Sequence, residues 1–576
     1  MDRRGRVLIV FVVMALGFGL VAARLVDLQI LKGDELAARA ERQQQRVVKL
    51  KPKRGTIYDR MGRELAVSLD VDSVFGVPSL VGNPRRLARR LARILDKDPR
   101  PLERKLSSDR HFVWLSRKVA PVVTRKIKNL GTREVGLLVE SRRFYPQKNL
   151  AGTAIGFTGI DNEGLEGVEL SYDSVLRGTS GWVLAEKDAV GRTVFPGGPA
   201  FQYRLSKQGK DIVLTIDSVI QHIVEKELDA ALERSQAKSG IGLVMDPRTG
   251  EVLALTVRSG AKGRAAFNPN TPLRSRPAEW RNRAITDAFE PGSIFKPILA
   301  AAALEEKLVS PQEQFDCSEG RIHVGGRVIR DASPHGTLTF IDVISDSSNV
   351  GTIQVGLRLG TKRFYRYIRD FGFGSKTGVD LPGEIGGLVK DYPQWNEMSL
   401  GAISIGQAIG VTPIQMVQAF SALANGGTLM KPYIVSEVID GNSGRGKKFK
   451  PQPVRRVISK GTHKKLNTIL QHVILTGTGM KAKPVGYTAA GKTGTAQKID
   501  PKTAAYSPRD YMSSFIGYAP AENPRLVILV TLDSPRGVVL GGMVAAPVFK
   551  AVAEKSLAYL QVPPDDVGGT MLLVAK

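Results

Sequence analysis

Residues 7–23, VLIVFVVMALGFGLVAA, form an uncharged run of seventeen residues, and three arginines precede it. Such a run is at the short end for a membrane-spanning helix and exceeds the apolar core of most signal peptides. Because basic residues keep the N-terminal flank in the cytoplasm, we expect a cytoplasmic tail over 1–6, an anchor over 7–23 and a body outside the cytoplasm. The alternative is a signal peptide cleaved near residues 21–23. Residues 24–45 have helical residue types and spacing, which suits a juxtamembrane helix.

Positive charge is concentrated near the N-terminus. The formal net charge is +28, and residues 1–150 hold 33 Lys and Arg against 15 Asp and Glu. Such a surface is able to attract nucleic acid, anionic lipid or an acidic substrate. Because the body is expected outside the cytoplasm, we expect no nucleic-acid partner and favour phospholipid head groups. The arginines within 83–96 recur at three- and four-residue spacing, which favours the solvated face of a basic helix.

The cysteine and histidine content limits the possible chemistry. One cysteine, Cys317, allows no intramolecular disulfide and no cysteine-based metal site, and the six histidines lack the spacing of metal ligands. We therefore expect no metal and no cofactor.

The chain of 576 residues is too long for one compact domain. Residues 24–203 mix short strands, helices and turns without the spacing of a catalytic site, and residues 204–211 are polar. Beyond them, two hairpins at 240–257 and 513–533 flank helix-rich sequence. This order predicts a sheet closed by the two ends of the C-terminal segment and covered by helices.

The S-x-x-K pattern occurs three times, at Ser235 to Lys238, Ser259 to Lys262 and Ser293 to Lys296. The first ends a helix, and the second lies in a loop rich in Gly, Lys and Arg. Only Ser293 begins a predicted helix, where residues three apart share a face. At a helix start, the N–H of the serine is also an unpaired donor that is available to an oxyanion.

Lys296 is a candidate base for Ser293. A serine hydroxyl is unreactive at neutral pH and needs a base to take its proton. Lys296 has the apolar neighbours Ile294, Phe295 and Pro297, and burial among apolar groups lowers the pKa of a lysine enough for this role. A histidine close in space is not excluded by the sequence. The alternative is that Ser293 caps a helix and Lys296 is a surface charge.

Two further patterns follow along the chain. SDSSNVG contains S-x-N as Ser347 and Asn349, which offer a hydroxyl relay and an amide that orients a lysine. AAGKTGTAQK contains Lys492, Thr493, Gly494 and Thr495 on a predicted strand. The edge of such a strand can pair with an extended peptide while the lysine and threonine groups hold its carboxylate.

The order of these motifs carries more weight than any one of them. A second K-T-G, at 376–378, precedes an Asp-Leu-Pro-Gly turn and has no apolar strand behind it, so we reject it. In the accepted set, Ser347 follows Ser293 by 54 residues and Lys492 follows Ser347 by 145 residues. Order and spacing together make a strong signal for serine acyl transfer.

With these motifs the chain resembles the class B penicillin-binding proteins, monofunctional D,D-transpeptidases that cross-link peptidoglycan. RGTIYDRMGRELA (54–66) and GLEGVELSYDSVLRGTSG (164–181) are similar to the two motifs of that class's pedestal. In the C-terminal part, the phrases in family order are NRAITDAFEPGSIFKP, DASPHG, SDSSNVG, FGFGSKTGVDLPGE, SIGQAIGVTPIQM, ALANGG and AGKTGTAQK. Within the class they are most similar to the division (septal) transpeptidases, with the elongation and spore types as alternatives.

The resemblance implies an α+β multidomain protein. Its parts are a transmembrane helix, an elongated mixed α/β pedestal of the dimerisation type, and a transpeptidase domain with an antiparallel sheet covered by helices, as in serine β-lactamases. The expected segments are a tail over 1–6, an anchor over 7–23, a pedestal over 24–203, a linker over 204–211, a transpeptidase domain over 212–560 and a tail over 561–576.

The resemblance also implies roles for the motif residues. Ser293 would attack the D-Ala-D-Ala carbonyl to form an acyl-enzyme, with Lys296 as its base, and Ser347 and Asn349 would relay the proton and position the lysine and the donor. An amine of a neighbouring stem peptide would then take the acyl group. β-Lactams would imitate D-Ala-D-Ala and leave a slowly hydrolysed ester on Ser293.

Substrate binding is expected on the K-T-G strand. Lys492, Thr493 and Thr495, with Gly494 between them, would hold the donor's terminal carboxylate. The backbone N–H groups of Ser293 and Thr495 would form the oxyanion hole.

Two positions depart from the family pattern. Ala408 stands where the family more often has Gly, and AGTAIGF (151–157) lacks a frequent histidine. From the resemblance we expect no glycosyltransferase domain ahead of the pedestal, so the implied partners include a membrane-embedded glycan polymerase and division-complex proteins. The implied location is the bacterial cytoplasmic membrane, with the catalytic domain in the periplasm at the septum.

Two other functions remain as alternatives. One keeps the fold but makes a D,D-carboxypeptidase or a relative of the β-lactamases, although the sequence has no recognisable glutamate motif for deacylation. The other is a non-catalytic scaffold anchored in the membrane, with the motifs retained as structure.

Overall fold

The computed structural model describes residues 2–36, 45–50, 52–110, 112–187, 193–194, 203–260, 266–441, 443–500 and 502–566. The chain divides into two compact units. One comprises Met1–Lys53 and Arg177–Gly209, and the other comprises Arg54–Leu176 and Lys210–Lys576. The segment expected as the pedestal therefore contributes to both units, and the domain boundaries stay a prediction.

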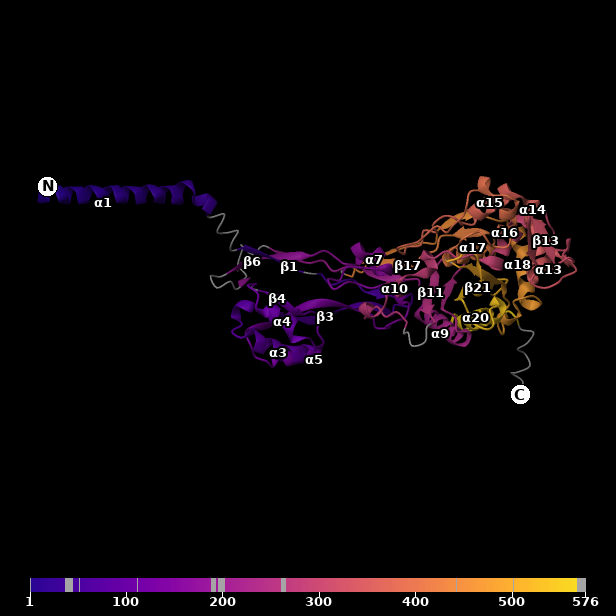
Figure 1. The fold of residues 1–576 in the computed structure, drawn as a ribbon, viewed down its shortest axis with the longest axis horizontal. Helices are drawn as coiled ribbons and strands as arrows, with labels where there is room; N and C mark the ends of the chain where they lie inside the picture. The colour runs from indigo at the N-terminus through magenta and orange to yellow at the C-terminus, as the bar shows by residue number, and fades with distance from the viewer. Residues whose placement is uncertain are drawn as a thin grey trace. The chain divides into compact units, whose positions relative to one another are not determined.

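The first unit begins with the apolar helix α1 (Arg3–Val26), which continues as a π-helical turn to Leu31 (Figure 1). Arg3–Leu31 is long and apolar enough to cross a membrane, and none of its most apolar window is buried. The expected juxtamembrane helix over 24–45 is only partly described, because 37–44 lie outside the described residues, and Gln45 begins a strand. The strands of this unit form a small antiparallel sheet around β6, namely β1 (Gln45–Leu50), β6 (Gly181–Lys187), β7 (Thr193–Val194) and β8 (Tyr203–Arg204).

A mixed sheet in the second unit joins distant parts of the sequence. Its order is β18-β17-β9-β2-β3-β4, and β5 also pairs with β3. The strands are β2 (Ile57–Tyr58), β3 (Glu64–Gly76), β4 (Val113–Ser116), β5 (Val135–Phe144), β9 (Asp211–Leu214), β17 (Val435–Ile439) and β18 (Gly446–Lys448). Since β9 pairs in parallel with β2 and antiparallel with β17, residues near 57 and near 437 belong to one sheet.

The predicted basic helix is α3 (Pro84–Leu95), which packs with α4 (Pro99–Leu106) and α5 (Pro121–Lys128). Its arginines are exposed, whereas Leu87 and Leu91 are buried. The arginine spacing therefore marks a solvated face, as expected.

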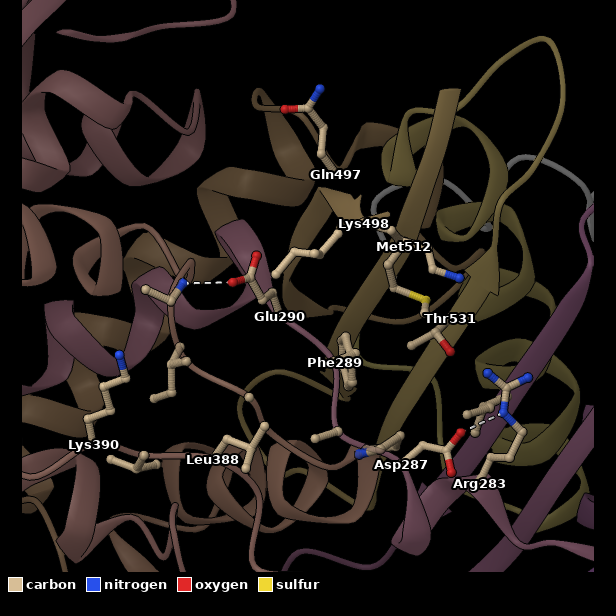
Figure 2. A pocket seen from close by; sticks show the side chains of 18 residues that line it. Arg283, Asp287, Phe289, Glu290, Leu388, Lys390, Gln497, Lys498, Met512 and Thr531 are labelled. Carbon is tan, nitrogen blue, oxygen red and sulfur yellow. Dashed lines mark hydrogen bonds and ion pairs between the residues drawn. The ribbon is translucent and has the colours of Figure 1, made fainter. Parts of the chain in front are cut away.

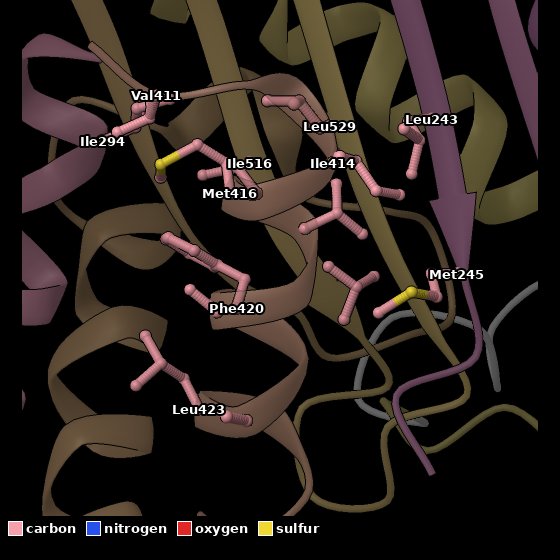
Figure 3. Close-up of a cluster of buried hydrophobic side chains, with 14 of the residues drawn as sticks. Leu243, Met245, Ile294, Val411, Ile414, Met416, Phe420, Leu423, Ile516 and Leu529 are labelled. Atoms are coloured by element: carbon pink, nitrogen blue, oxygen red, sulfur yellow. The ribbon is translucent and has the colours of Figure 1, made fainter. Parts of the chain in front are cut away.

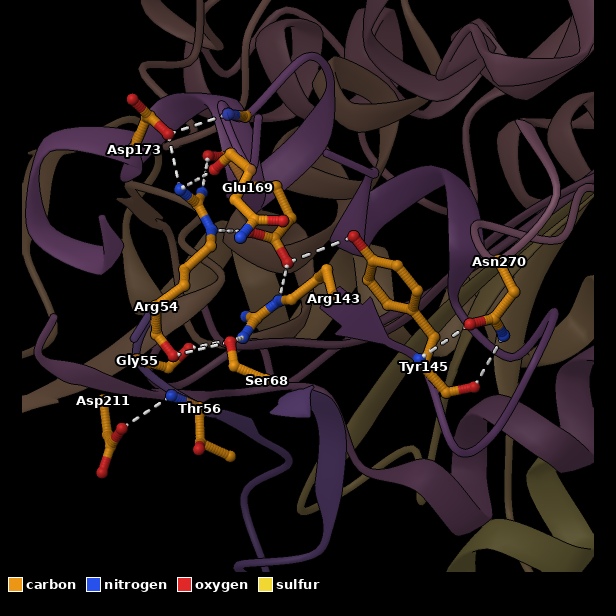
Figure 4. A network of polar contacts seen from close by, with 12 residues as sticks. Arg54, Gly55, Thr56, Ser68, Arg143, Tyr145, Glu169, Asp173, Asp211 and Asn270 are labelled. Atoms are coloured by element: carbon orange, nitrogen blue, oxygen red, sulfur yellow. Dashed lines mark hydrogen bonds and ion pairs between the residues drawn. The ribbon is translucent and has the colours of Figure 1, made fainter. Parts of the chain in front are cut away.

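A buried charge cluster ties the two pedestal motifs together (Figure 4). Arg54 Nε donates to Glu169 Oε2 at 2.6 Å, and Arg54 Nη1 donates to Asp173 Oδ1 at 2.6 Å. Arg143 Nε donates to the other oxygen of Glu169, also at 2.6 Å. The side chains of Arg54 and Arg143 are each 2% exposed and that of Glu169 is 0% exposed, so each buried guanidinium has a carboxylate partner.

The C-terminal part of the second unit is built on a five-stranded antiparallel sheet. Its order is β11-β10-β22-β21-β20, from β10 (Ser239–Met245), β11 (Val252–Ser259), β20 (Ala490–Ile499), β21 (Tyr506–Ala519) and β22 (Leu526–Asp533). Both predicted hairpins are present, and the sheet is closed by the two ends of the segment. The K-T-G strand β20 lies at an edge.

Helices cover both faces of this sheet, as predicted. On one face, Val244 packs toward α9 (Ser218–Ser235) and α20 (Ala546–Tyr559). On the other face, the adjacent Leu243 and Met245 pack toward α17 (Pro413–Ala424). Figure 3 shows Leu243 and Met245 on the α17 side, with Ile414 and Phe420 from the helix. The alternation follows from the two-residue period of a strand. Each fully buried side chain of this size contributes about 1.5–3 kcal/mol.

Candidate active site

Ser293 lies in a 3-10 turn, Gly292–Phe295, and Lys296 is the first residue of the helix α12 (Lys296–Glu305). The expected helix start is therefore a tighter turn followed by an α-helix. Lys296 is 0% exposed, whereas Ser293 is partly exposed. A partly exposed hydroxyl thus precedes a buried amine by one turn.

Glycines allow the backbone around Ser293 to pack closely. Gly292 has a φ of +57°, and its N–H donates to Gly406 O at 2.9 Å. A Cβ on Gly406 would lie 2.1 Å from Gly292 O. A larger residue at position 406 would displace the serine turn, and one at position 292 would be strained by its positive φ.

The S-x-N turn holds the amine of Lys296. Lys296 Nζ donates to Ser347 O at 2.6 Å and to Asn349 Oδ1 at 2.9 Å, and it lies 3.3 Å from Ser347 Oγ. Ser347 has a φ of +65°, which is uncommon for a residue with a side chain. The turn joins α13 (Phe340–Ser345) to α14 (Asn349–Leu359). The structure therefore brings the predicted Ser347 and Asn349 to the predicted base.

The environment of Lys296 favours its neutral form. Burial lowers the pKa of Lys296 well below its usual value, and the nearby charge of Lys492 lowers it further. The carboxylate of Asp331 acts in the opposite direction. In the described part of the chain, the acceptors of Lys296 Nζ are uncharged. A neutral amine is able to accept a proton from Ser293.

The K-T-G strand supplies the second buried lysine. Lys492 is 0% exposed, and burial lowers its pKa to about 7, against an opposing effect of Asp346. Thr493 Oγ1 shares a hydrogen bond of 2.7 Å with Thr478 Oγ1, and Thr495 Oγ1 accepts from Gly541 N at 3.0 Å. The two hydroxyls of this strand are thus held in place by their neighbours, and Lys492 Nζ lies 3.3 Å from Thr493 O.

Gly494 lets the K-T-G strand approach the serine turn. A Cβ on Gly494 would lie 2.9 Å from Ile294 Cγ2 and 3.4 Å from Ile294 N. Because β20 is an edge strand, its alternate N–H and C=O groups point away from β21. The backbones of Ser293 and Thr495, predicted to form the oxyanion hole, therefore belong to two segments in close contact.

The rejected motifs lie in other surroundings. Ser235 Oγ donates to Ala231 O at 2.6 Å within its own helix, while Lys238 Nζ pairs with Asp510 at 3.0 Å. Ser259 ends β11 and is exposed, and Lys262 lies outside the described residues.

The second K-T-G forms a turn around a carboxylate. The N–H and hydroxyl of Thr377 both donate to Glu384 Oε1, and Gly378 N donates to Glu384 Oε2 at 3.1 Å. Lys376 is exposed. Unlike Lys492, Lys376 is neither buried nor part of a strand.

A cavity of about 760 Å³ adjoins the motif residues (Figure 2). Its lining includes Glu290, three residues before Ser293, and Gln497, two residues after Thr495, but not the motif residues themselves. Glu290 accepts from Ala408 N at 2.9 Å and from Tyr506 OH at 3.0 Å. The space is therefore bordered by the segments that carry the nucleophile and the K-T-G motif.

Three polar residues of the site were not singled out from the sequence. Thr478 holds Thr493, and Asp346 and Asp331 act electrostatically on the two lysines. Asp331 opens the phrase DASPHG and Asp346 lies within SDSSNVG, so both lay in stretches already quoted, but neither had a recognisable spacing.

Comparisons with known proteins identify the family of this chain. The penicillin binding protein transpeptidase domain family matches residues 240–554, and the penicillin-binding protein dimerisation domain family matches residues 49–214. Stage V sporulation protein D of Bacillus subtilis is 37% identical over 97% of this chain and 86% of its own length. Peptidoglycan D,D-transpeptidase FtsI of Escherichia coli is 32% identical over 96% of this chain and 91% of its own length.

A solved structure of a penicillin-binding protein also has the fold of this chain. Penicillin binding protein 3 of Mycobacterium tuberculosis, complexed with aztreonam, superposes with a TM-score of 0.70 and 30% identity over 90% of this chain and 98% of that chain. The fold is that of a serine D,D-transpeptidase. The chain belongs to the penicillin-binding proteins, and within them to class B, with a pedestal domain ahead of the transpeptidase domain.

Proposed function

We propose that Ser293 is the nucleophile of this peptidoglycan D,D-transpeptidase and that neutral Lys296 takes its proton. The observation that carries the proposal is the burial of Lys296 among uncharged acceptors, one turn from a partly exposed serine. The bond from Ser293 Oγ to the D-Ala carbonyl carbon forms, and the bond to the terminal D-Ala nitrogen breaks. The proton passes to that leaving amine, with Ser347 as relay.

The second half of the reaction returns the enzyme to its starting state. An amine of a neighbouring stem peptide attacks the ester carbonyl, a new amide bond forms, and Ser293 Oγ leaves as it regains a proton. Asn349 orients Lys296 and the donor in both halves, because its side-chain oxygen accepts from Lys296 Nζ.

The donor's terminal carboxylate binds to Lys492, Thr493 and Thr495, with Gly494 allowing close approach. The backbone N–H groups of Ser293 and Thr495 stabilise the oxyanion, and removal of one such donor costs about 3 kcal/mol in other enzymes. The contact between Gly494 and the Ile294 backbone supports this arrangement.

Covalent labelling tests the assignment of Ser293. We expect a labelled penicillin to attach to the wild-type protein and not to Ser293→Ala. Ser235→Ala, in the rejected S-x-x-K pattern, is the matched control and should label like the wild type. Equal labelling of Ser293→Ala would end the assignment. Labelling would also support inhibition by β-lactams, in line with the aztreonam complex of the related protein.

The hydrolase alternative is tested by product analysis. A pentapeptide donor is incubated with and without an amine acceptor. We expect the cross-linked amide to dominate when the acceptor is present, whereas predominant free tetrapeptide would favour a D,D-carboxypeptidase.

We further propose a septal role in division, with α1 as a single-pass anchor and the catalytic domain in the periplasm. The motif phrases support the septal role, and the similarity to stage V sporulation protein D supports the spore-wall alternative. Localisation of a fluorescent fusion separates the two, because sidewall or forespore fluorescence would exclude the septum. The glycan polymerase and division-complex proteins are the proposed partners.

A further inference from the structure

Asp331 follows a small hairpin and reaches the turn that holds Lys296. The hairpin pairs β13 (Arg321–Val324) with β14 (Arg327–Arg330), and Asp331 N donates to Gly320 O at 2.9 Å, which closes the loop. Asp331 therefore stands at a fixed place beside the first turn of α14.

The carboxylate of Asp331 accepts from three donors of one short segment. Ser348 Oγ donates to Oδ2 at 2.8 Å, Val350 N donates to Oδ1 at 3.1 Å, and Asn349 N also donates to Oδ1. The first turn of a helix leaves such N–H groups without partners, so a carboxylate is favourable there. These contacts fix the backbone on both sides of Asn349.

The residue before Asp331 fixes the side chain of Asn349. Asn349 Nδ2 donates to Arg330 O at 2.9 Å, while Asn349 Oδ1 accepts from Lys296 Nζ at 2.9 Å. With its nitrogen held by the hairpin, the amide presents its oxygen to the lysine. The strained φ of Ser347 lies immediately before this segment.

We propose that Asp331 is a positioning residue for acylation: its carboxylate fixes the Ser347–Asn349 turn that holds the amine of Lys296. The proposal rests on the proposed role of Lys296 as base. Asp331 does not touch the reacting atoms and acts through Asn349 and Ser348.

Asp331 also contributes to the charge balance of the base. The charged groups that act on Lys296 are Lys492 on β20, which lowers its pKa, and Asp331, which raises it. Among the described residues, the other titratable groups beside this cluster include Asp346, which directly precedes Ser347 and acts on Lys492, and the buried thiol of Cys317, 3.5 Å from Ser348 Oγ. Loss of the Asp331 charge removes the opposing effect, so the pKa of Lys296 falls further.

The test is the pH profile of penicillin acylation for the full-length Asp331→Asn protein. We expect the plateau rate to fall about tenfold, because the turn is less firmly held, and the acidic limb to move to lower pH. Glu319→Gln is the matched control, because it removes one negative charge from the same hairpin region at a side chain that is 75% exposed. This variant should leave the plateau rate and the acidic limb of the pH profile unchanged.

Two results would overturn the proposal. One is an Asp331→Asn profile identical to the wild type. The other is a lower plateau with an unmoved acidic limb, since a merely structural role predicts that outcome. If Asp331→Asn does not fold, Ser348→Ala removes one donor to the same carboxylate, and an unchanged plateau in that variant would reject the proposal.

The result is distinguishable from failure of the proposed function. If Ser293→Ala still labels, the assignment of the nucleophile fails. If Ser293→Ala loses labelling and Asp331→Asn behaves like the wild type, only the role of Asp331 fails.

Discussion

Two clusters of buried basic residues in this protein differ in whether their side chains pair with a carboxylate. In the pedestal motifs, the guanidinium groups of Arg54 and Arg143 both contact Glu169 at 2.6 Å. At the site, Lys296 and Lys492 are equally buried, but their hydrogen bonds go to uncharged oxygens. Burial disfavours the charged form in both clusters. Only in the pedestal cluster do ion pairs with Glu169 offset this desolvation cost. The first cluster thus keeps its charges, and the second favours neutral amines that can take a proton.

The largest expected effect is on catalysis. Lys296→Met should lower the acylation rate about 10³-fold, the range for loss of a general base. Because Lys296 has no carboxylate partner that would be left unpaired, stability should fall less than when the paired cluster is broken. Stopped-flow acylation and urea unfolding measure the two effects. If Lys296→Met unfolds as easily as Glu169→Gln, the contrast between the clusters is wrong.

The paired cluster should show the opposite behaviour. Glu169→Gln leaves two buried guanidinium groups without their shared carboxylate and should lower the free energy of unfolding by about 3–5 kcal/mol. The folded fraction should acylate at the wild-type rate. Glu64→Gln, at an exposed position at the start of β3, is the control and should change stability by less than about 0.5 kcal/mol.

The unpaired cluster should make stability depend on pH in a predictable direction. The pKa of Lys492 is about 7 in the folded protein and 10.5 as its ordinary value. Between these values the unfolded chain binds one more proton at Lys492, so the contribution of Lys492 to the free energy of unfolding should rise with pH, by at most about 1.4 kcal/mol per pH unit. Lys492→Met should flatten this slope, as measured by urea unfolding from pH 7 to 10. An equal slope in both proteins would mean that Lys492 is not responsible.

The smallest effect concerns a residue between the site and the adjoining cavity. Ala408 has a φ of +56°, in the left-handed region that favours glycine. Ala408→Gly removes the backbone strain of the folded protein, but it also raises the conformational entropy of the unfolded chain. We therefore expect the free energy of unfolding to rise by only about 0.5 kcal/mol. The buried lysines are untouched, and the acylation rate should stay the same. A changed rate would show that this segment influences the site by another route.

The sequence predicted what depends on local pattern. The apolar runs on either side of a turn predicted the two hairpins, and the helix start at Ser293 distinguished it from Ser235. Lys296 and Asn349, 53 residues apart, were grouped by motif order and the family resemblance rather than by geometry.

Contacts without a local pattern were not predictable. Arg54 and Glu169 are 115 residues apart, and nothing in either neighbourhood indicates that a guanidinium and a carboxylate will meet. Asp331 reaches Asn349 only because a hairpin folds back, and the strand β17 pairs with β9 across more than 200 residues. Such pairings are decided by tertiary packing.

The mixed sheet has a practical consequence for dissecting the molecule. A fragment that begins at residue 212 would keep most of β9 and all of β17 but lose β2 and β3. The edge of β9 that pairs with β2 would then be open to pairing with other chains. Such a fragment should therefore aggregate although every motif residue is present, and the smallest soluble catalytic piece must include the strands near residue 57.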